Sequence, residues 1–278
     1  MPQDAQQPVL RFDHVSVSFD GVPALADVSF RAFEGESRVI MGATGSGKTV
    51  LMKTALGLQR PDAGTVYVFG QDISRMRERD LFQIRSKIGM LFQESALFDS
   101  LNIEENVSYP LLNQSSIHCP PEEVRPRVEE ALKFVELEGI LEKFPSELSG
   151  GMRRRAAIAR AVVTQPPLVL YDSPTAGLDP ITATTIMALV VKERDLNKTT
   201  TLIVTYRYQD GNLVANFRYN PKNGALERAE SPAGDGGAAA PRTFFMVLHE
   251  GRLIFEGPQA DLEASQDPYI GKFVKHRG

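Results

Sequence analysis

The chain reads Gly42-Ala43-Thr44-Gly45-Ser46-Gly47-Lys48-Thr49, and this stretch decides its fold class. It matches a phosphate-binding loop, whose glycines tolerate positive φ and let successive backbone N–H groups approach a phosphate chain. Residues 36–41 before it read as a strand, and residues 48–53 begin a helix whose N-terminal dipole favours an anion. A chance glycine turn is the alternative, and the flanking strand and helix favour the phosphate loop. In that interpretation Lys48 reaches the β and γ phosphates of a nucleotide, and Thr49 holds Mg²⁺.

Composition is that of an ordinary globular chain. Of its 278 residues 42% are apolar and 24% are charged, enough for a full core in one large domain or two modest ones. The longest apolar stretches are far shorter than the ~20 residues that cross a bilayer. Residues 1–7 lack the features of a secretion signal, and Cys119, the single cysteine, fits a reducing compartment.

Charge argues against nucleic acid as a partner, because the net charge is −4. Three consecutive arginines stand at positions 153–155. We interpret them as a solvated helix face or a contact between subunits rather than as a nucleic-acid patch.

The order of the predicted elements indicates a mostly parallel sheet with two additions. Residues 9–32 alternate as two antiparallel strands, and residues 102–144 have a helical pattern that predicts an inserted helical subdomain, with Pro110, Pro120-Pro121 and Pro126 at boundaries. Residues 221–241 combine low apolar content with clustered glycine, which predicts a flexible surface loop. The other predicted elements are strands at 66–70, 88–92, 168–171 and 200–204, helices at 78–86 and 181–196, and a hairpin of 243–248 with 252–255.

Two further motifs follow the phosphate loop along the chain. Residues 168–172 form an apolar strand that ends in Asp172, which would place a carboxylate beside Mg²⁺ at the carboxyl edge of the sheet. Before it stands Leu148-Ser149-Gly150-Gly151-Met152, at the start of a predicted helix. In this order the three elements resemble the ATP-binding cassette (ABC) family.

The ABC resemblance implies that Ser149, Gly150 and Gly151 bind the γ-phosphate of an ATP held by the opposite subunit. Exposed N–H groups at a helix N-terminus suit an anion. The alternative is that Ser149 only caps its helix.

Nearly the whole chain, residues 9–219 and 243–274, takes part in this resemblance. It implies an α/β fold, a P-loop NTPase of ABC type, with a mostly parallel core sheet, an N-terminal antiparallel β subdomain and an inserted helical subdomain. Residues 1–278 would then form a single ABC ATP-binding domain. Its parts would be a catalytic core at 9–100 and 165–274, a helical subdomain with the signature at 101–164, and a flexible insertion at 221–242.

Further site residues are implied by the same family. Gln93 would contact Mg²⁺ or the attacking water and sense the transporter, and Asp179 would cross the dimer interface. Phe19 stands where the family stacks an aromatic ring on adenine, and the alternative is a strand residue that faces the core. The implied cofactors are ATP and Mg²⁺, with Thr49, Gln93 and Asp172 as metal ligands.

Two positions depart from the family. Ser173 follows Asp172 where the family has a glutamate that polarises water, and a serine hydroxyl cannot accept a proton near neutral pH. Tyr206 stands where the family has a histidine that contacts the γ-phosphate, and a phenol carries no positive charge. We therefore expect the chain to bind Mg-ATP and to dimerise around it, while its own site hydrolyses slowly or not at all.

Residues 89–100 and 106–111 look like those of the ATPases of Mla/Mce-type lipid (organic-solvent resistance) transporters. This implies an integral-membrane permease as a partner, and a lipid-binding Mce-type protein. The chain would lie in the cytoplasm, on the inner face of the cell membrane. Leu97, Phe98 and Leu101 would form an apolar surface for the permease, or else pack as core residues under a loop.

The expected function is the ATP-binding subunit of an ABC transporter that moves lipids. The second subunit of the ABC dimer would be either another copy or an intact partner that retains the glutamate. A non-hydrolytic module that regulates or assembles a permease is the alternative. An ABC protein of DNA repair or translation is disfavoured, because neither long coiled-coil insertions nor tandem cassettes are visible.

Overall fold

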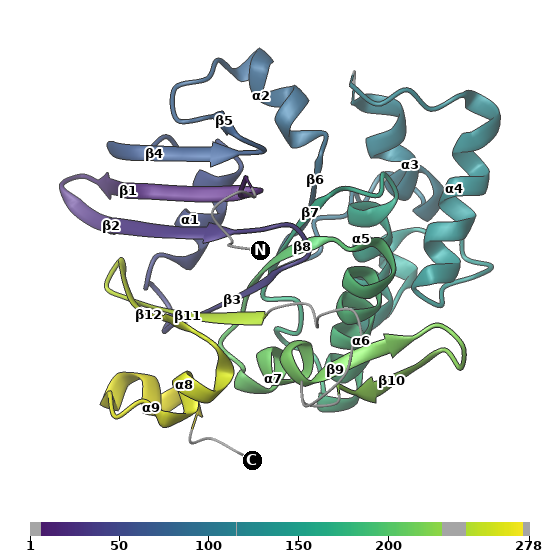
Figure 1. Cartoon of the computed structure of the whole chain (residues 1–278). Helices are drawn as coiled ribbons and strands as arrows, with labels where there is room; N and C mark the ends of the chain where they lie inside the picture. The colour runs from purple at the N-terminus through teal and green to yellow at the C-terminus, as the bar shows by residue number, and fades with distance from the viewer. Residues whose placement is uncertain (1–6, 115, 230–242, 275–278) are drawn as a thin grey trace.

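The computed structural model describes residues 7–114, 116–229 and 243–274. Its strands form two sheets and a separate hairpin, while a group of helices stands beside the larger sheet (Figure 1). Within the described residues, no helix combines the length and hydropathy needed to span a bilayer.

The larger sheet has six strands in the order β12-β11-β3-β8-β7-β6. Five of them are parallel, and β12 runs antiparallel to β11 at one edge. Every residue of β3, β7 and β8 is buried, as expected for parallel strands covered on both faces. The prediction of a mostly parallel sheet is confirmed. The strands are β3 Ser37–Met41, β6 Ile88–Leu91, β7 Leu168–Asp172, β8 Thr200–Val204, β11 Thr243–His249 and β12 Arg252–Gly257.

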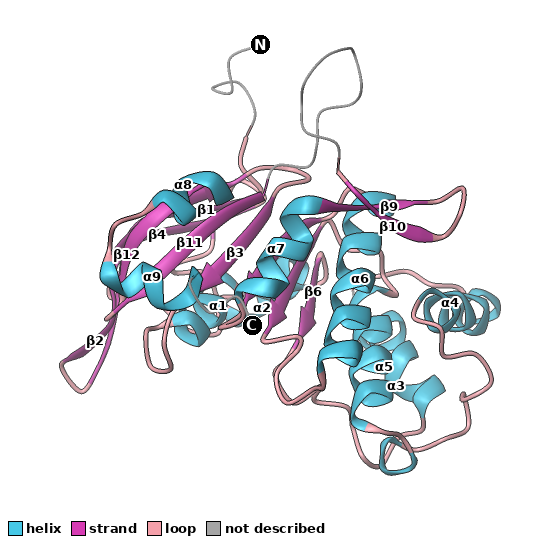
Figure 2. Ribbon diagram, turned by 90° about the horizontal axis from the view of Figure 1, so that it is seen from below, coloured by secondary structure: helices cyan, strands magenta, loops and turns pink. Residues whose placement is uncertain are grey.

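Alternate residues of these strands point into different cores. Ile40, Leu170 and Val204 pack with the smaller sheet and helix α1, Lys48–Ala55. Val39 and Tyr171 point to the other face, which is covered by α6 Pro180–Asn197, α7 Tyr208–Asn216, α8 Gln259–Ala264 and α9 Pro268–Val274 (Figure 2). Because the carboxyl ends of parallel strands meet at one edge, the loops after β3, β7 and β8 come together there.

The smaller sheet lies on the α1 side and has the order β2-β1-β4-β5. Strand β1 pairs antiparallel with both β2 and β4, and Phe12 stacks on Phe30 with ring centroids 4.8 Å apart. The predicted antiparallel pair in residues 9–32 is confirmed. The elements here are β1 Leu10–Phe19, β2 Val22–Ala32, β4 Ala63–Val68, β5 Gln71–Asp72 and the helix α2 Glu78–Arg85.

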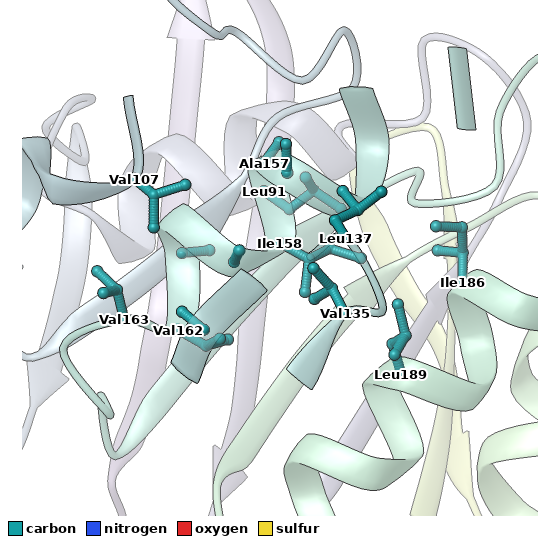
Figure 3. Packing of buried hydrophobic residues seen from close by; sticks show 14 of the residues in the cluster. Leu91, Val107, Val135, Leu137, Ala157, Ile158, Val162, Val163, Ile186 and Leu189 are labelled. Atoms are coloured by element: carbon teal, nitrogen blue, oxygen red, sulfur yellow. The ribbon is translucent and has the colours of Figure 1, made fainter. Parts of the chain in front are cut away.

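The helical subdomain packs as one apolar cluster against β6, β7 and α6 (Figure 3). Its elements are α3 Ile103–Asn113, α4 Pro121–Phe134, the 3₁₀ turn η2 Pro145–Glu147 and α5 Gly150–Val162. The prediction that Pro110 and Pro126 mark boundaries is wrong, because both lie inside helices. Burial of neighbours such as Val107 and Val128 outweighs the missing backbone hydrogen bond.

Part of the predicted flexible loop at 221–242 is ordered. Strand β10, Ala225–Arg228, pairs with β9, Phe217–Asn220. The Gly224 N–H donates to the Asn220 carbonyl at 2.9 Å, and Gly224 has a φ of +69°. The loop prediction is therefore wrong for residues 225–228, because a four-residue turn, 221–224, closes a hairpin there with Gly224 in the left-handed conformation. Residues 230–242 lie outside the described residues.

Candidate functional site

The phosphate loop joins β3 to α1 at the carboxyl edge of the larger sheet. Gly42 and Gly47 have φ values of +155° and +103°. A Cβ at Gly42 would collide with the carbonyl oxygen of Leu248 in β11, and one at Gly47 with that of Ala24 in β2. Both positions therefore require glycine for space as well as for conformation.

Lys48 folds back onto the phosphate loop. Its Nζ donates to the carbonyl oxygens of Gly42 at 2.8 Å and Ala43 at 2.7 Å. Burial lowers the pKa of Lys48, and the attraction of Asp172 opposes that shift. The ammonium group is thus held beside the backbone that would surround a phosphate.

Predicted residues from four stretches of the chain line one cleft of about 330 Å³, which we call the phosphate cleft. Burial raises the pKa of Asp172, while the hydrogen bond from the Ser173 hydroxyl and the charge of Lys48 oppose that shift. Of the predicted phosphate-loop residues, Ala43 and Ser46 do not line this cleft. The predicted residues that line it are Gly42, Thr44, Gly45, Gly47, Lys48, Thr49, Gln93, Asp172, Ser173 and Tyr206.

The oxygen donors of the phosphate cleft fit Mg²⁺. Thr49, Gln93 and Asp172 supply a hydroxyl, an amide oxygen and a carboxylate. Across the described residues, no three His, Cys, Asp or Glu side chains cluster in a way that could hold a metal. Mg²⁺ is usually bound through one or two carboxylates together with substrate phosphates and water. This donor set therefore suits an ion that arrives with a nucleotide.

Ser173 and Tyr206 stand at the edge of the phosphate cleft. Ser173 has a φ of +51°, and its hydroxyl donates to Asp172 Oδ1 at 3.1 Å. Tyr206 is 56% exposed. Neither side chain supplies the carboxylate base or the cationic donor that the ABC pattern has at these positions.

A second cleft, of about 570 Å³, lies between the starts of α5 and α6, and we call it the signature cleft. Ser149 Oγ accepts the Met152 N–H at 3.2 Å, so Ser149 caps its helix. Its binding of a phosphate stays a prediction. The N–H groups of Gly150 and Gly151 belong to the first helical turn, where intrahelical acceptors are missing. The predicted residues Ser149, Gly150, Gly151 and Asp179 all line this cleft.

Asp179 is fixed at the start of α6. Its carboxylate accepts the N–H groups of Ile181 and Thr182, each at 3.0 Å. The hydrogen bond from the Thr182 hydroxyl lowers the pKa of Asp179. Asp179 and Ser173 lie on the same loop after β7, so this loop lines both clefts.

Phe19 lies outside both the phosphate cleft and the signature cleft. It ends β1, is 47% exposed, and lines neither cleft. The alternative that Phe19 faces the core is therefore wrong. Its stacking on adenine stays a prediction.

Of the predicted apolar surface after Gln93, Leu97 belongs to the core and Phe98 is exposed. Leu97 packs against the cluster of the helical subdomain. Phe98, 42% exposed, stacks on Tyr109, 40% exposed, with ring centroids 4.8 Å apart. Phe98 and Tyr109 thus form an exposed aromatic pair beside the loop that carries Gln93.

The interpretation of residues 153–155 as a solvated face or subunit contact is wrong for Arg154. This side chain is 6% exposed and joins two loops of the clefts. Its guanidinium donates to the Phe92 carbonyl at 3.0 Å and to the Ala176 carbonyl at 3.4 Å. Burial lowers the pKa of Arg154, and the charge of Asp172 opposes that shift. The signature helix therefore holds the loops that carry Gln93 and Asp179.

Tyr269, in α9, is a second residue that the sequence did not indicate. Its hydroxyl accepts the N–H of Ala43 in the phosphate loop at 2.9 Å. The same hydroxyl donates to the Leu248 carbonyl at 3.3 Å, and its ring stacks on His249. The C-terminal helix thus contributes directly to the position of the phosphate loop.

Replacement Tyr269→Phe is expected to weaken Mg-ATP binding about threefold, since a hydrogen bond of this kind contributes about 0.5–1.5 kcal/mol. Calorimetric titration with Mg-ATP measures the change. Tyr67→Phe is the control, because Tyr67 lies on β4 and lines neither cleft. Equal affinity in wild type and Tyr269→Phe would contradict the prediction.

Comparison with known proteins gives the family. The ABC transporter family model matches residues 25–176. The chain belongs to the ABC transporter family. The predicted P-loop NTPase fold of ABC type is thereby confirmed. In agreement, a dimeric bacterial ABC transporter cassette has a TM-score of 0.74 at 29% identity, covering 90% of this chain and 98% of its own.

Three relatives of this ABC protein bear on its subgroup. The probable ribonucleotide transport ATP-binding protein mkl of Mycobacterium leprae is 33% identical over 260 residues, covering 94% of this chain and 67% of its own length. The intermembrane phospholipid transport system ATP-binding protein MlaF of Haemophilus influenzae is 31% identical over 249 residues, covering 90% and 83%. The mkl protein of Mycobacterium bovis is longer than this chain, which spans 64% of its length. The resemblance to Mla/Mce-type ATPases is confirmed.

Proposed function

We propose that this chain is the ATP-binding subunit of an ABC transporter and couples Mg-ATP binding to transport through a membrane permease. One observation carries the proposal: the predicted phosphate-binding residues other than Ala43 and Ser46 line two clefts that share no lining residue. A single chain therefore offers two half-sites. A second subunit would complete each of them, and a solved cassette similar to this chain is a dimer bound to ADP and phosphate.

Each half-site has a distinct role in this proposal. In the phosphate cleft, Lys48 and the loop N–H groups would bind the phosphates, while Thr49, Gln93 and Asp172 would hold Mg²⁺. In the signature cleft, Ser149, Gly150 and Gly151 would bind the γ-phosphate of the partner's ATP. Mg²⁺, when bound, neutralises charge on the phosphate oxygens.

We propose phospholipid as the transported substrate. The support is the likeness to MlaF, an intermembrane phospholipid transport protein by name, over 83% of its length. The permease would contact the exposed pair Phe98 and Tyr109. This arrangement would place the chain in the cytoplasm, on the inner face of the membrane, in a complex with a lipid-binding Mce-type protein.

Hydrolysis in the phosphate cleft is proposed to be slow. A positioned general base contributes about 10²–10⁴-fold to a rate, and Ser173 cannot serve as one at neutral pH. In a homodimer both sites would have this defect. In a heterodimer the intact signature cleft would complete a competent site of the partner, and we favour that arrangement. A second candidate function is a non-hydrolytic module that regulates or assembles a permease. Ser173 and Tyr206, which replace the expected glutamate and histidine, support it as well.

The signature cleft offers a test that leaves the fold untouched. A Cβ added at Gly150 would meet nothing within 4 Å, so Gly150→Ala should preserve thermal stability and Mg-ATP binding in the phosphate cleft. It should weaken ATP-dependent dimerisation about tenfold or more, because the methyl group would occupy space proposed for the partner's phosphate. Light scattering with and without Mg-ATP measures dimerisation, with each variant added to the wild-type chain or its ABC partner.

Gly151→Ala provides the contrast, because its Cβ would lie 2.7 Å from Thr182 Cγ2 and disturb the isolated chain as well. Adding Thr182→Ser removes that methyl group and keeps the hydroxyl that donates to Asp179. The double variant should regain stability but not dimerisation. Unchanged dimerisation in Gly150→Ala would overturn the proposed role of the signature cleft.

A further inference from the structure

The loop after β7 and the loop after β8 meet at one buried carboxylate, Asp210. The first loop carries Ser173 of the phosphate cleft and Asp179 of the signature cleft, and the second carries Tyr206. Asp210 lies in the first turn of α7 and lines neither cleft. It therefore cannot touch a nucleotide in either cleft, but it can hold the loops that do.

Two short hydrogen bonds connect Asp210 to these loops. Its Oδ2 accepts the hydroxyl of Thr175 at 2.6 Å and the hydroxyl of Thr205 at 2.6 Å. The two threonines are 1% exposed and Asp210 is 3% exposed. The contacts are thus shielded from water, where hydrogen bonds to a charged group are strong.

Thr205 extends this connection to the phosphate loop. Its N–H donates to the Ile40 carbonyl of β3 at 3.0 Å, and β3 leads into the phosphate loop. Its hydroxyl oxygen also accepts the Arg207 N–H at 3.0 Å, which closes the turn that carries Tyr206. Asp210 therefore joins a loop of both clefts to the strand beneath the phosphate loop.

Burying the carboxylate of Asp210 costs free energy, which a residue without a role at the two clefts would not be expected to require. Burial raises the pKa of Asp210, and the hydrogen bonds from Thr175 and Thr205 oppose that shift. The cation nearest to it, Arg207, has its Nε 3.8 Å from Asp210 Oδ1 and so neutralises the charge only in part. Apolar packing commonly stabilises a fold as well as a buried charge does, so the carboxylate points to a need for defined loop geometry.

We propose that Asp210 is a positioning residue that ties the loop of Ser173 and Asp179 to the loop of Tyr206, so that the two clefts of one chain respond together to a nucleotide. This inference rests on the proposed function, in which the phosphate cleft takes Mg-ATP. Residues 173–179 form the loop that lines both clefts, and Asp210 acts on the clefts by holding this loop.

Hydrogen exchange of the full chain tests the role directly. Mg-ATP bound in the phosphate cleft should slow exchange in the phosphate loop and in residues 173–179 of the wild type. In Asp210→Asn, Mg-ATP should still protect the phosphate loop, while residues 175–179 should exchange about tenfold faster than in the wild type. Exchange at this loop is a readout that a general loss of stability would not single out.

Glu193→Gln is the matched control, because Glu193 is another buried carboxylate, 1% exposed, that accepts a threonine hydroxyl from Thr199 at 3.1 Å. It lies near the far end of α6 and lines neither cleft. It should lower stability without changing the protection of residues 173–179 by Mg-ATP. An identical exchange pattern in Asp210→Asn and Glu193→Gln would overturn the proposal.

A threonine pair keeps the test valid if Asp210→Asn fails to fold. Thr175→Val removes the hydroxyl with little change of shape, whereas Thr175→Ser keeps it. Thr175→Val should lose the protection of residues 175–179, and Thr175→Ser should retain it. Equal protection in the two variants would overturn the role of Asp210, whereas a wild type that binds no Mg-ATP at all would overturn the proposed function with it.

Discussion

Replacement of Ser173 by glutamate is expected to raise the ATP turnover of the purified chain about 100-fold. Glutamate would place a carboxylate base next to Asp172, at the edge of the phosphate cleft, and a positioned base contributes about 10²–10⁴-fold. We expect the lower end of that range for two reasons. Residue 173 has a φ of +51°, which disfavours a longer side chain, and a second carboxylate would be repelled by Asp172.

Ser173→Gln is the matched control, because glutamine has the shape of glutamate without its basicity. Phosphate release at saturating Mg-ATP measures the turnover of wild type and both variants. If Ser173→Gln gained as much as Ser173→Glu, the effect would come from shape and the proposed missing base would be wrong. Wild-type turnover at an ordinary transporter rate would equally contradict it.

Tyr206→His, added to Ser173→Glu, should increase turnover further, because both residues line the same cleft. An imidazole can donate a charged hydrogen bond to a phosphate, which the phenol cannot. A double variant that hydrolyses ATP would show that only these side chains separate the chain from an active ATPase.

The sequence predicted the core sheet because its strands have unambiguous patterns. The apolar runs of β3, β7 and β8 are short, fully buried and separated by helical periodicity. The prolines were misjudged for the opposite reason. Proline has a strong local preference, and the burial of Val107 and Val128 that overrides it is a tertiary effect.

The candidate site was predictable where motifs are continuous and not where distant segments meet. The burial of Arg154 was not predicted, because it stands in a run of three arginines that reads as a solvated face. It nevertheless lies three and four residues before the buried Ala157 and Ile158. A charge on the apolar stripe of a helix is the signal that could have found it. Tyr269 had no such signal, because it contacts Ala43 across 226 residues of chain.

Gly47→Ala is expected to weaken Mg-ATP binding by at least about 100-fold. The added Cβ would collide with the Ala24 carbonyl oxygen and lie 3.1 Å from Leu25 Cδ2, and a φ of +103° is one that alanine rarely adopts. Since Gly47 is the N-cap of α1, the loop would have to move away from β2 and carry Lys48 with it. Calorimetric titration with Mg-ATP measures the loss.

The control for this prediction separates space from backbone conformation. Gly139 also has a positive φ, +76°, but its Cβ would meet nothing within 4 Å, and it lines neither cleft. Gly139→Ala should therefore keep wild-type affinity at a modest cost in stability, while Lys48→Ala should lose affinity without any collision. If Gly47→Ala bound Mg-ATP as tightly as Gly139→Ala does, the close approach of the phosphate loop to β2 would not be needed for nucleotide binding. The affinity would then have to come from groups other than the loop backbone.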